Sequence, residues 1–543
     1  MLRSLPLTCL VATAQALIIN LPYNEASLAP VVDLGYAKYR GVGLKAGVDQ
    51  FLGMRYAEAP LGDLRFRAPQ DPTPQDAIQD AIQDATNFGP ICVGVGQTVD
   101  AGHSEDCLFV NVFKPSTATN DSNLPVWVYI QGGGYSANAN QDYNGTEVVK
   151  QSGNNIVFVN FNYRVGALGF LASPQVQQDG ALNAGLLDQR KLLHWVQTNI
   201  KKFGGDPNHV VIHGASAGAG SVAYHLTAYN GKKDNKLFAG AIAESPFWPT
   251  QRTVNEMEFQ YVQLQLNSGC EDLACLRSLD VAQLLNASNI YPFPNAAADA
   301  PKPLWYWLPV IDGDMITDHF YNLFNKNQFI HVPFLVGDDT DEGRSFGYNA
   351  TTPDQVTSFL KSNYPNLSKK QLKNIKKAYK FKKKPVPQHA DYFAAASAAY
   401  GDATFTCPGM FMAWSFGRYF NQNQVFSYRY NVQDEQNIAA GLGVPHVFES
   451  SAIFGPGNAG GAAASYYTTN AAIVPITMRY FISFVRAFDP NTFKDSAAPI
   501  WIPFGSSERM KLQTNNTEME ILPPDVGKKC SLWMRLSYAM GTL

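Results

Sequence analysis

The sequence has little of what marks a nucleic-acid-binding, membrane-spanning or metal-dependent protein. Charged residues make up 16% of its 543 residues and the formal net charge is −3, so no general positive field favours nucleic acid. No run of about 18 uncharged apolar residues occurs, as a transmembrane helix would need. No cluster of His, Cys, Asp or Glu has the spacing of metal ligands. We therefore expect no nucleic-acid partner, no integral membrane segment and no metal.

The N-terminus has the parts of an export signal. Arg3 supplies a weak positive start, residues 5–12 form a short apolar stretch, and Ala14-Gln15-Ala16 is a small-residue cleavage site. The alternative is a buried N-terminal strand. The position of the cleavage site favours a signal peptide over residues 1–16 and a secreted mature protein.

Cysteine is scarce, and its number fits secretion. Cys9 lies in the signal segment, and removal of that segment leaves six cysteines, an even number suited to an oxidising compartment. They are Cys92, Cys107, Cys270, Cys275, Cys407 and Cys530. Proximity favours Cys92–Cys107 and Cys270–Cys275, which would leave Cys407–Cys530, but six cysteines allow 15 pairings and spacing alone does not choose.

N-glycosylation sequons also fit a secretory route, since the acceptor sequence is Asn-x-Ser/Thr. Six begin at Asn120, Asn144, Asn286, Asn349, Asn366 and Asn515.

From about residue 124 onwards, apolar strands alternate with helical segments. Such alternation predicts an α/β fold with a largely parallel sheet covered on both faces. With neither an internal repeat nor a long linker, we expect residues 17–543 to form one domain. The expected strands are Leu124–Ile130, Ile156–Phe161, Val210–His213, Leu237–Glu244 and His331–Val336, and Leu186–Phe203 is expected to be helical.

Residues 369–384 contain nine lysines, and Ser368 is placed to begin a helix there. A basic binding patch is one interpretation. The acidic balance of the whole chain favours the other, a solvated surface helix. Residues 455–464 are rich in Gly and Ala and predict a mobile loop.

The most informative stretch is Val210–Gly220, VVIHGASAGAG, an apolar strand that runs into G-x-S-x-G and then into a helix of small residues. A nucleophile on a sharp strand-to-helix turn needs small neighbours because the backbone is strained. The helix N-terminus there stabilises developing negative charge. We therefore predict that Ser216 is a catalytic nucleophile.

Donors for an oxyanion are expected upstream, at Gly132-Gly133-Gly134, which follows a strand directly. Glycines allow backbone N–H groups to approach a reacting carbonyl. The amide of Ala217, the residue after the nucleophile, is a further donor. A simple turn is the alternative, whereas a Walker phosphate loop is excluded because no Lys-Ser/Thr follows.

A serine nucleophile needs a His base and a carboxylate, which follow it in this chain order. His446 lies on a Gly/Pro loop near the C-terminus, where such a base is expected, whereas His225 and His331 fit structural roles better. The acid should end a late strand. Four candidates follow Val336, and position alone does not choose among Asp338, Asp339, Asp341 and Glu342.

From about residue 48 to the C-terminus the sequence resembles the type-B carboxylesterase/lipase family, which includes cholinesterases and secreted fungal lipases. The motifs that carry the resemblance are FLGMRYA at 51–57, SEDCLFVNV at 104–112, NYRVGALGFL at 162–171, LDQR at 187–190 and FGGDP at 203–207.

The resemblance implies an α/β-hydrolase fold, a cofactor-free ester hydrolase and a Ser-His-Glu triad. Its D-E-G motif matches Asp341-Glu342-Gly343 and so assigns the acid to Glu342. It assigns His446 as base, and Gly133, Gly134 and Ala217 to the oxyanion hole. It also implies all three disulfides, including Cys407–Cys530, and structural ion pairs of Arg65 with Glu105 and of Arg164 with Asp188.

Three departures bear on the substrate. Ala215 stands where the family usually has Glu, which argues against a cationic choline ester. Gln131 replaces the His that many esterases have before the glycines, which is a mild change. The Cys92–Cys107 loop is shorter than the lid loop of the family's lipases, which favours soluble esters over emulsified triglycerides. The sequence therefore predicts an esterase acting on neutral small-molecule esters. A true interfacial lipase is the first alternative, and a catalytically silent adhesion protein the second.

Overall fold

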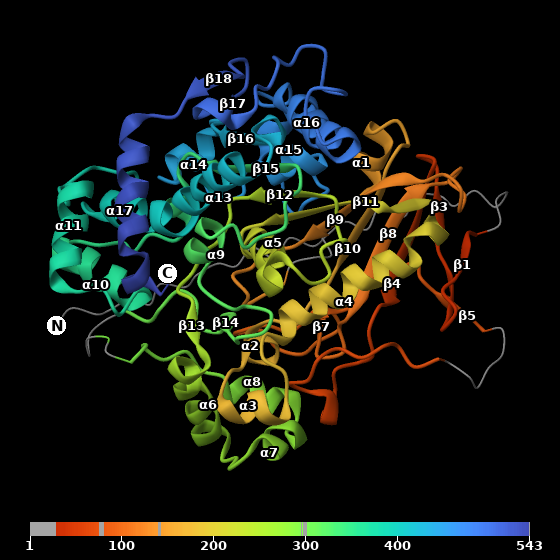
Figure 1. Ribbon diagram of the computed structural model, residues 1–543, viewed down its shortest axis with the longest axis horizontal. Coiled ribbons are helices and arrows are strands. Elements are labelled where there is room, and N and C mark those ends of the chain that lie inside the picture. Colours follow the sequence, from red (N-terminus) through yellow and green to blue (C-terminus); the bar gives the residue numbers. More distant parts are fainter. Residues whose placement is uncertain (1–28, 75–80, 139–142, 295, 297–300, 542–543) are drawn as a thin grey trace, which may run out of the picture.

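The computed structural model describes residues 29–74, 81–138, 143–294, 296 and 301–541. The signal segment expected at residues 1–16 lies outside them. An eleven-stranded sheet runs through the molecule (Figure 1). Its strands, in spatial order, are β18 (Glu518–Ile521), β17 (Glu508–Leu512), β16 (Val425–Tyr430), β15 (Phe334–Asp339), β12 (Gly240–Glu244), β11 (Gly205–Ala215), β9 (Leu124–Ile130), β10 (Val157–Phe161), β8 (Phe109–Pro115), β4 (Val48–Arg55) and β3 (Val42–Leu44).

The central strands are parallel and the outer ones antiparallel. From β17 to β10 each neighbouring pair is parallel, whereas β18, β8, β4 and β3 pair antiparallel with their neighbours. In register, Ala215 of β11 lies beside Glu244 of β12, and Ile242 beside His213. Because the parallel strands end at one edge, the turns that follow β11, β12 and β15 meet there.

Helices cover both faces of the sheet, as the strand pattern requires. One face, with Val128, Val210 and Ile212, packs against α4 (Ala184–Asn199), α5 (Ala217–Thr227), α9 (Phe320–Asn325) and α13 (Cys407–Tyr419). The opposite face, with Trp127, Val211 and Ile242, packs against α1 (Thr146–Gln151), α15 (Ser450–Phe454) and α16 (Ile473–Ala487). The fold class is the α/β-hydrolase architecture expected from the sequence.

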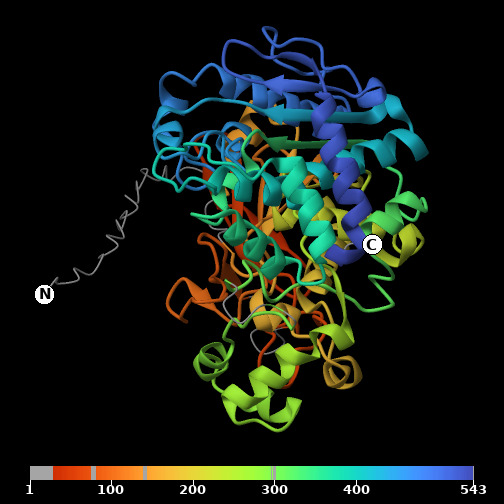
Figure 2. The same ribbon diagram turned by 90° about the vertical axis from the view of Figure 1, so that its left-hand side faces the viewer.

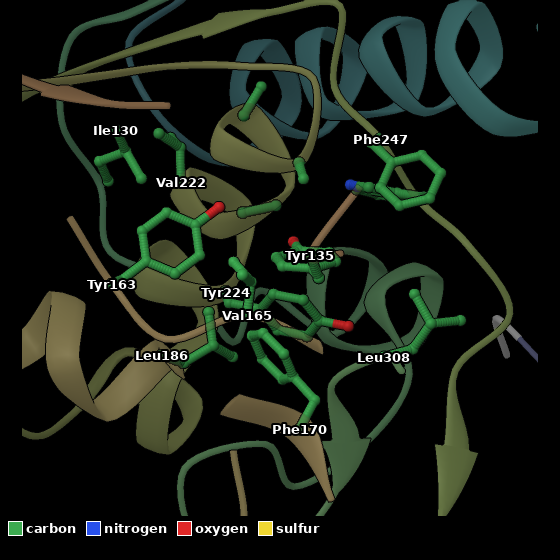
Figure 3. Packing of buried hydrophobic residues seen from close by; sticks show 14 of the residues in the cluster. Ile130, Tyr135, Tyr163, Val165, Phe170, Leu186, Val222, Tyr224, Phe247 and Leu308 are labelled. Atoms are coloured by element: carbon green, nitrogen blue, oxygen red, sulfur yellow. The ribbon is translucent and has the colours of Figure 1, made fainter. Parts of the chain in front are cut away.

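Aromatic and aliphatic side chains fill the core below the nucleophile's turn. Figure 3 shows Val222 and Tyr224 of α5 near Tyr135, Tyr163 and Phe170. The rings of Tyr135 and Phe170 meet edge to face, with centroids 5.2 Å apart. All five side chains are buried, so the loop that carries Tyr135 is anchored against α5, the helix that begins after Ser216.

The remaining helices lie around this layered core. A group at one end, opposite the C-terminal strands, contains α3, α6, α7 and α8 (Figures 1 and 2). The bounds of all the remaining helices are α2 (Gly166–Phe170), α3 (Pro174–Asp179), α6 (Val254–Ser268), α7 (Leu273–Ser278), α8 (Val281–Ala287), α10 (Pro353–Asn363), α11 (Lys369–Tyr379), α12 (Phe393–Gly401), α14 (Glu435–Ala439) and α17 (Pro524–Met540). In the described part of the chain, no helix combines the length and apolar character needed to cross a bilayer.

The three expected disulfides and both expected ion pairs are present. The bonds are Cys92–Cys107, Cys270–Cys275 and Cys407–Cys530. Arg65 donates to both carboxylate oxygens of Glu105, at 2.6 and 2.7 Å. Arg164 is bound in the same way by Asp188, at 2.8 and 2.6 Å, with both side chains buried. Forked pairs of this kind are the geometry that a guanidinium and a carboxylate favour.

Several strand boundaries differ from the expectation: the strand expected from Leu237 begins at Gly240, and the one expected to end at Val336 ends at Asp339. The strand expected from His331 begins at Phe334, because Pro333 has no N–H to donate to a ladder, and His331 lies exposed before it. The strand expected from Val210 begins at Gly205, and an irregularity in its pairing with β9 between Gly205 and Val210 separates the two parts. The lysine-rich helix begins after Ser368, whose side chain and Gln371 form a capping box.

Candidate active site

Ser216 lies on a strained turn between β11 and α5. Its φ of 57° and ψ of −122° lie in a region that side chains other than glycine rarely adopt. Its N–H donates to the carbonyl oxygen of Glu244 at 2.9 Å. Gly218 has no room for a Cβ, which would lie 1.9 Å from the Ile130 carbonyl oxygen. The small residues of the motif therefore serve close packing, and the turn brings Ser216 to the edge of the sheet.

The glycine loop after β9 lies beside the nucleophile. A Cβ at Gly132 would lie 2.8 Å from the Ser216 Cβ. Gly133 and Gly134 have φ of 103° and 61°, and both line the same pocket as Ser216. Ala217 is the first residue of α5, so its N–H lies at the helix N-terminus. The residues expected to form the oxyanion hole therefore lie around Ser216.

His446 and Glu342 are in contact although 104 residues separate them in the chain. The Nδ1 of His446 is hydrogen-bonded to Oε2 of Glu342, and their side chains are 6% and 2% exposed. Glu342 Oε1 accepts a second hydrogen bond from the N–H of Asp339, at 2.8 Å. Among the described residues the buried Nε2 of His446 has no hydrogen-bond partner, and His446 lines the pocket that Ser216 lines. This nitrogen is therefore free to accept a proton from a group in the pocket.

The other residues considered for the acid and the base contact groups other than each other. Asp338 lies 3.8 Å from Arg509, Asp341 forms an ion pair with Arg344, and Asp339 accepts from the N–H of Phe448 at 3.2 Å. His225 is buried in α5 and contacts Gln189 at 2.9 Å.

The pocket around Ser216 is small and its walls are partly aromatic. Its volume is about 240 Å³. Trp305 closes the side next to Gly134, where an added Cβ would lie 2.0 Å from the indole ring. Phe346 and Phe405 pack against the His446 ring, with centroids 5.0 and 4.3 Å away. These aromatic residues follow no motif, and the sequence did not identify them.

Below the pocket lies a buried His–Glu pair that the sequence also did not single out. His213, three residues before Ser216, contacts Glu244 with its Nε2 3.1 Å from Oε2. Both side chains are fully buried. Burial lowers the pKa of His213 to about 3 and raises the pKa of Glu244 to about 8.

Comparisons with known proteins identify a family and its solved relatives. The model of the carboxylesterase family matches residues 29–533. Among solved structures, EstA from Aspergillus niger is 56% identical, with a TM-score of 0.92 over 94% of this chain and 99% of that one. Lipase 2 from Geotrichum candidum is 31% identical over 82% of this chain and 85% of its own length. Secreted lipase 4 from Gibberella zeae is 28% identical, covering 91% and 89%.

Proposed function

The chain belongs to the carboxylesterase family and is a carboxylic ester hydrolase, and from this we propose that it is a secreted serine esterase for neutral esters with short acyl chains. The observation that carries the proposal is the contact of Glu342 with His446 beside the pocket of Ser216.

In the proposed mechanism His446 takes the proton of Ser216 through Nε2 as the serine attacks the ester carbonyl. Glu342 holds the imidazole with its proton on Nδ1 and stabilises the imidazolium that forms. The amides of Gly133, Gly134 and Ala217 bind the oxyanion. His446 then protonates the leaving alcohol, and water repeats the sequence to release the acid. Apart from the ester and water, every group in this sequence of steps belongs to the chain.

Two observations favour small soluble esters over emulsified lipid. A pocket of about 240 Å³ is below the range of about 300–1,000 Å³ that drug-sized ligands occupy. Within residues 93–106, enclosed by Cys92–Cys107, Val99 is the one large apolar side chain that is exposed. This loop therefore offers little apolar surface to an oil–water interface.

Secretion is part of the proposal. Residues 1–16 would act as the signal peptide and residues 17–543 as the mature hydrolase domain. Relatives named secreted lipases support this, as do the three disulfides. Of the six sequon asparagines, Asn144 is half-buried and the other five are exposed, which leaves the latter accessible to glycosylation.

The test is hydrolysis of p-nitrophenyl butyrate and labelling by a fluorophosphonate. We expect Ser216→Ala to abolish labelling and to lower kcat by at least about 10⁴-fold. His446→Gln should also be inactive. The matched control His331→Gln, at an exposed histidine, should keep wild-type activity. A wild-type protein that fluorophosphonate does not label would contradict the proposal.

The lipase alternative has its own measurement. Activity on tributyrin is followed as its concentration passes the solubility limit. We expect no sharp rise at that point, because the loop between Cys92 and Cys107 lacks an apolar lid surface. A steep rise would favour an interfacial lipase.

A further inference from the structure

Glu244 lies between β11, the strand that leads into Ser216, and the segment that carries His446. It is the last residue of β12 and pairs in register with Ala215, the residue before the nucleophile. Its carbonyl oxygen accepts the Ser216 N–H at 2.9 Å. The backbone of Glu244 therefore holds the strained turn of Ser216 in place.

The side chain of Glu244 reaches the other half of the site. Its Oε1 is hydrogen-bonded to the Oγ of Ser450, at 2.5 Å. Ser450 is the first residue of α15 and follows His446 by four residues. One residue thus contacts both the turn that carries Ser216 and the segment that carries His446.

His213 fixes the orientation of the Glu244 carboxyl. The indole N–H of Trp127 donates to Nδ1 of His213 at 3.2 Å, so the imidazole proton lies on Nε2 and is donated to Oε2 of Glu244. These groups are buried, and a buried polar group left without its partner costs about 1–3 kcal/mol. The Glu244 carboxyl therefore has one favoured orientation.

We propose that Glu244 is a positioning residue that sets the placement of His446 relative to Ser216, with His213 holding its carboxyl in the required orientation. The inference rests on the proposed Ser-His-Glu mechanism. A general base must lie within hydrogen-bond reach, about 2.6–3.2 Å between heavy atoms, of the group whose proton it takes. An error of about 1 Å in such a placement can lower the rate about 100-fold.

A conservative variant of Glu244 makes the role testable. Burial raises the pKa of Glu244 to about 8; the hydrogen bond from Ser450 acts in the opposite direction, and Glu342 adds a smaller upward contribution. His213 donates to Oε2 and the Ser450 hydroxyl donates to Oε1, so each carboxyl oxygen accepts a hydrogen bond. A glutamine keeps both contacts, because its carbonyl accepts from His213 and its amide donates to the Ser450 oxygen once the serine hydroxyl has rotated to accept. A leucine of similar size leaves both partners unpaired.

The experiment compares kcat, KM and the rate of fluorophosphonate inactivation. Ser450→Ala removes only the link to the base's segment, and we expect kcat and the inactivation rate to fall about tenfold with KM within about twofold. Glu244→Gln should stay within about threefold of the wild type, whereas Glu244→Leu should lose at least as much as Ser450→Ala.

The matched control is Ser483→Ala. Ser483 is also buried, its Oγ donates to the Asp489 carbonyl at 2.7 Å, and it lies in α16, outside the pocket. Its loss should lower the melting temperature by a similar amount while kcat stays unchanged.

An unchanged kcat in Ser450→Ala would overturn the positioning role, as would an equal fall of kcat in Ser483→Ala. Either result leaves the proposed function intact if Ser216→Ala still abolishes labelling. Should Glu244→Leu fail to fold, Ser450→Ala and Glu244→Gln still decide the question.

Discussion

Single residues around the pocket adopt backbone conformations that most side chains would not tolerate. Gly133 has a φ of 103°, and a Cβ there would lie 2.0 Å from the carbonyl oxygen of Ala137. Ser216 is itself strained, as a nucleophile on a sharp turn must be. The catalytic arrangement therefore depends on which residues are small as much as on which are reactive.

Gly133→Ala is the prediction at this scale. The added methyl group must displace the loop, so the amide leaves the position where the oxyanion forms. We expect kcat to fall about 10²–10³-fold, the cost of one lost oxyanion donor. The control is Gly417→Ala in α13, where a Cβ meets nothing within 4 Å. Steady-state kinetics on p-nitrophenyl butyrate measure both, and a loss below about threefold in Gly133→Ala would contradict the assignment.

At the scale of elements, the site is assembled by segments far apart in the chain. Ser216 follows β11, Glu342 follows β15, and His446 lies in the connection between β16 and α15. The parallel order β11-β12-β15-β16 brings these strand ends to one edge. Helices hold that edge in place, and among them α13 and α17 are joined covalently by Cys407–Cys530.

This disulfide should contribute more to stability than the short one. Cys407–Cys530 closes a loop of 123 residues, whereas Cys270–Cys275 closes five. In the chain-entropy account, a longer loop restricts the unfolded state more, and closure of about 100 residues is worth about 4.7 kcal/mol. We expect the double Ser variant at 407 and 530 to lower the melting temperature more than the double Ser variant at 270 and 275. Calorimetry of both checks it, and the reverse order would contradict it.

At the scale of the whole molecule, several carboxyls are buried together behind the site. Burial raises the pKa of Glu244, Asp338 and Glu449 to about 8. It also raises the pKa of Asp339, and the nearby carboxyl of Glu449 raises that pKa further. The folded protein therefore holds protons that the unfolded chain releases above its ordinary carboxyl pKa of about 4–4.5. Unfolding is favoured progressively as the pH rises from that value towards 8.

Melting temperature should consequently fall between pH 6.5 and 8.5. The buried histidines His213 and His225 have lowered pKa values and act in the opposite direction, but only below about pH 6.5, where a free histidine is protonated. Glu244→Gln should make the fall shallower, whereas Glu435→Gln, at an exposed position, should leave it unchanged. Calorimetry at constant ionic strength gives the slopes, and a melting temperature that rises over this range would contradict the account.

Much of the site could be read from the sequence because its chemistry is local. G-x-S-x-G after an apolar strand predicted Ser216 as the nucleophile, and the glycine run predicted oxyanion donors, of which the family resemblance selected Gly133 and Gly134. The choice of Glu342 among four acids came from a family motif, since position along the chain did not distinguish them. In the structure, Glu342 is the one of the four in contact with His446.

The sequence by itself determined the alternation of strands and helices, the small residues of the turn and the cysteines available for pairing, since each depends on near neighbours in the chain. Only the tertiary structure decided that Trp305 and Phe346 line the pocket, that Phe405 packs against His446, and that Glu244 connects the segments of Ser216 and His446. These contacts join residues up to 206 positions apart. Sheet order and the packing of loops create them, and no local pattern encodes either.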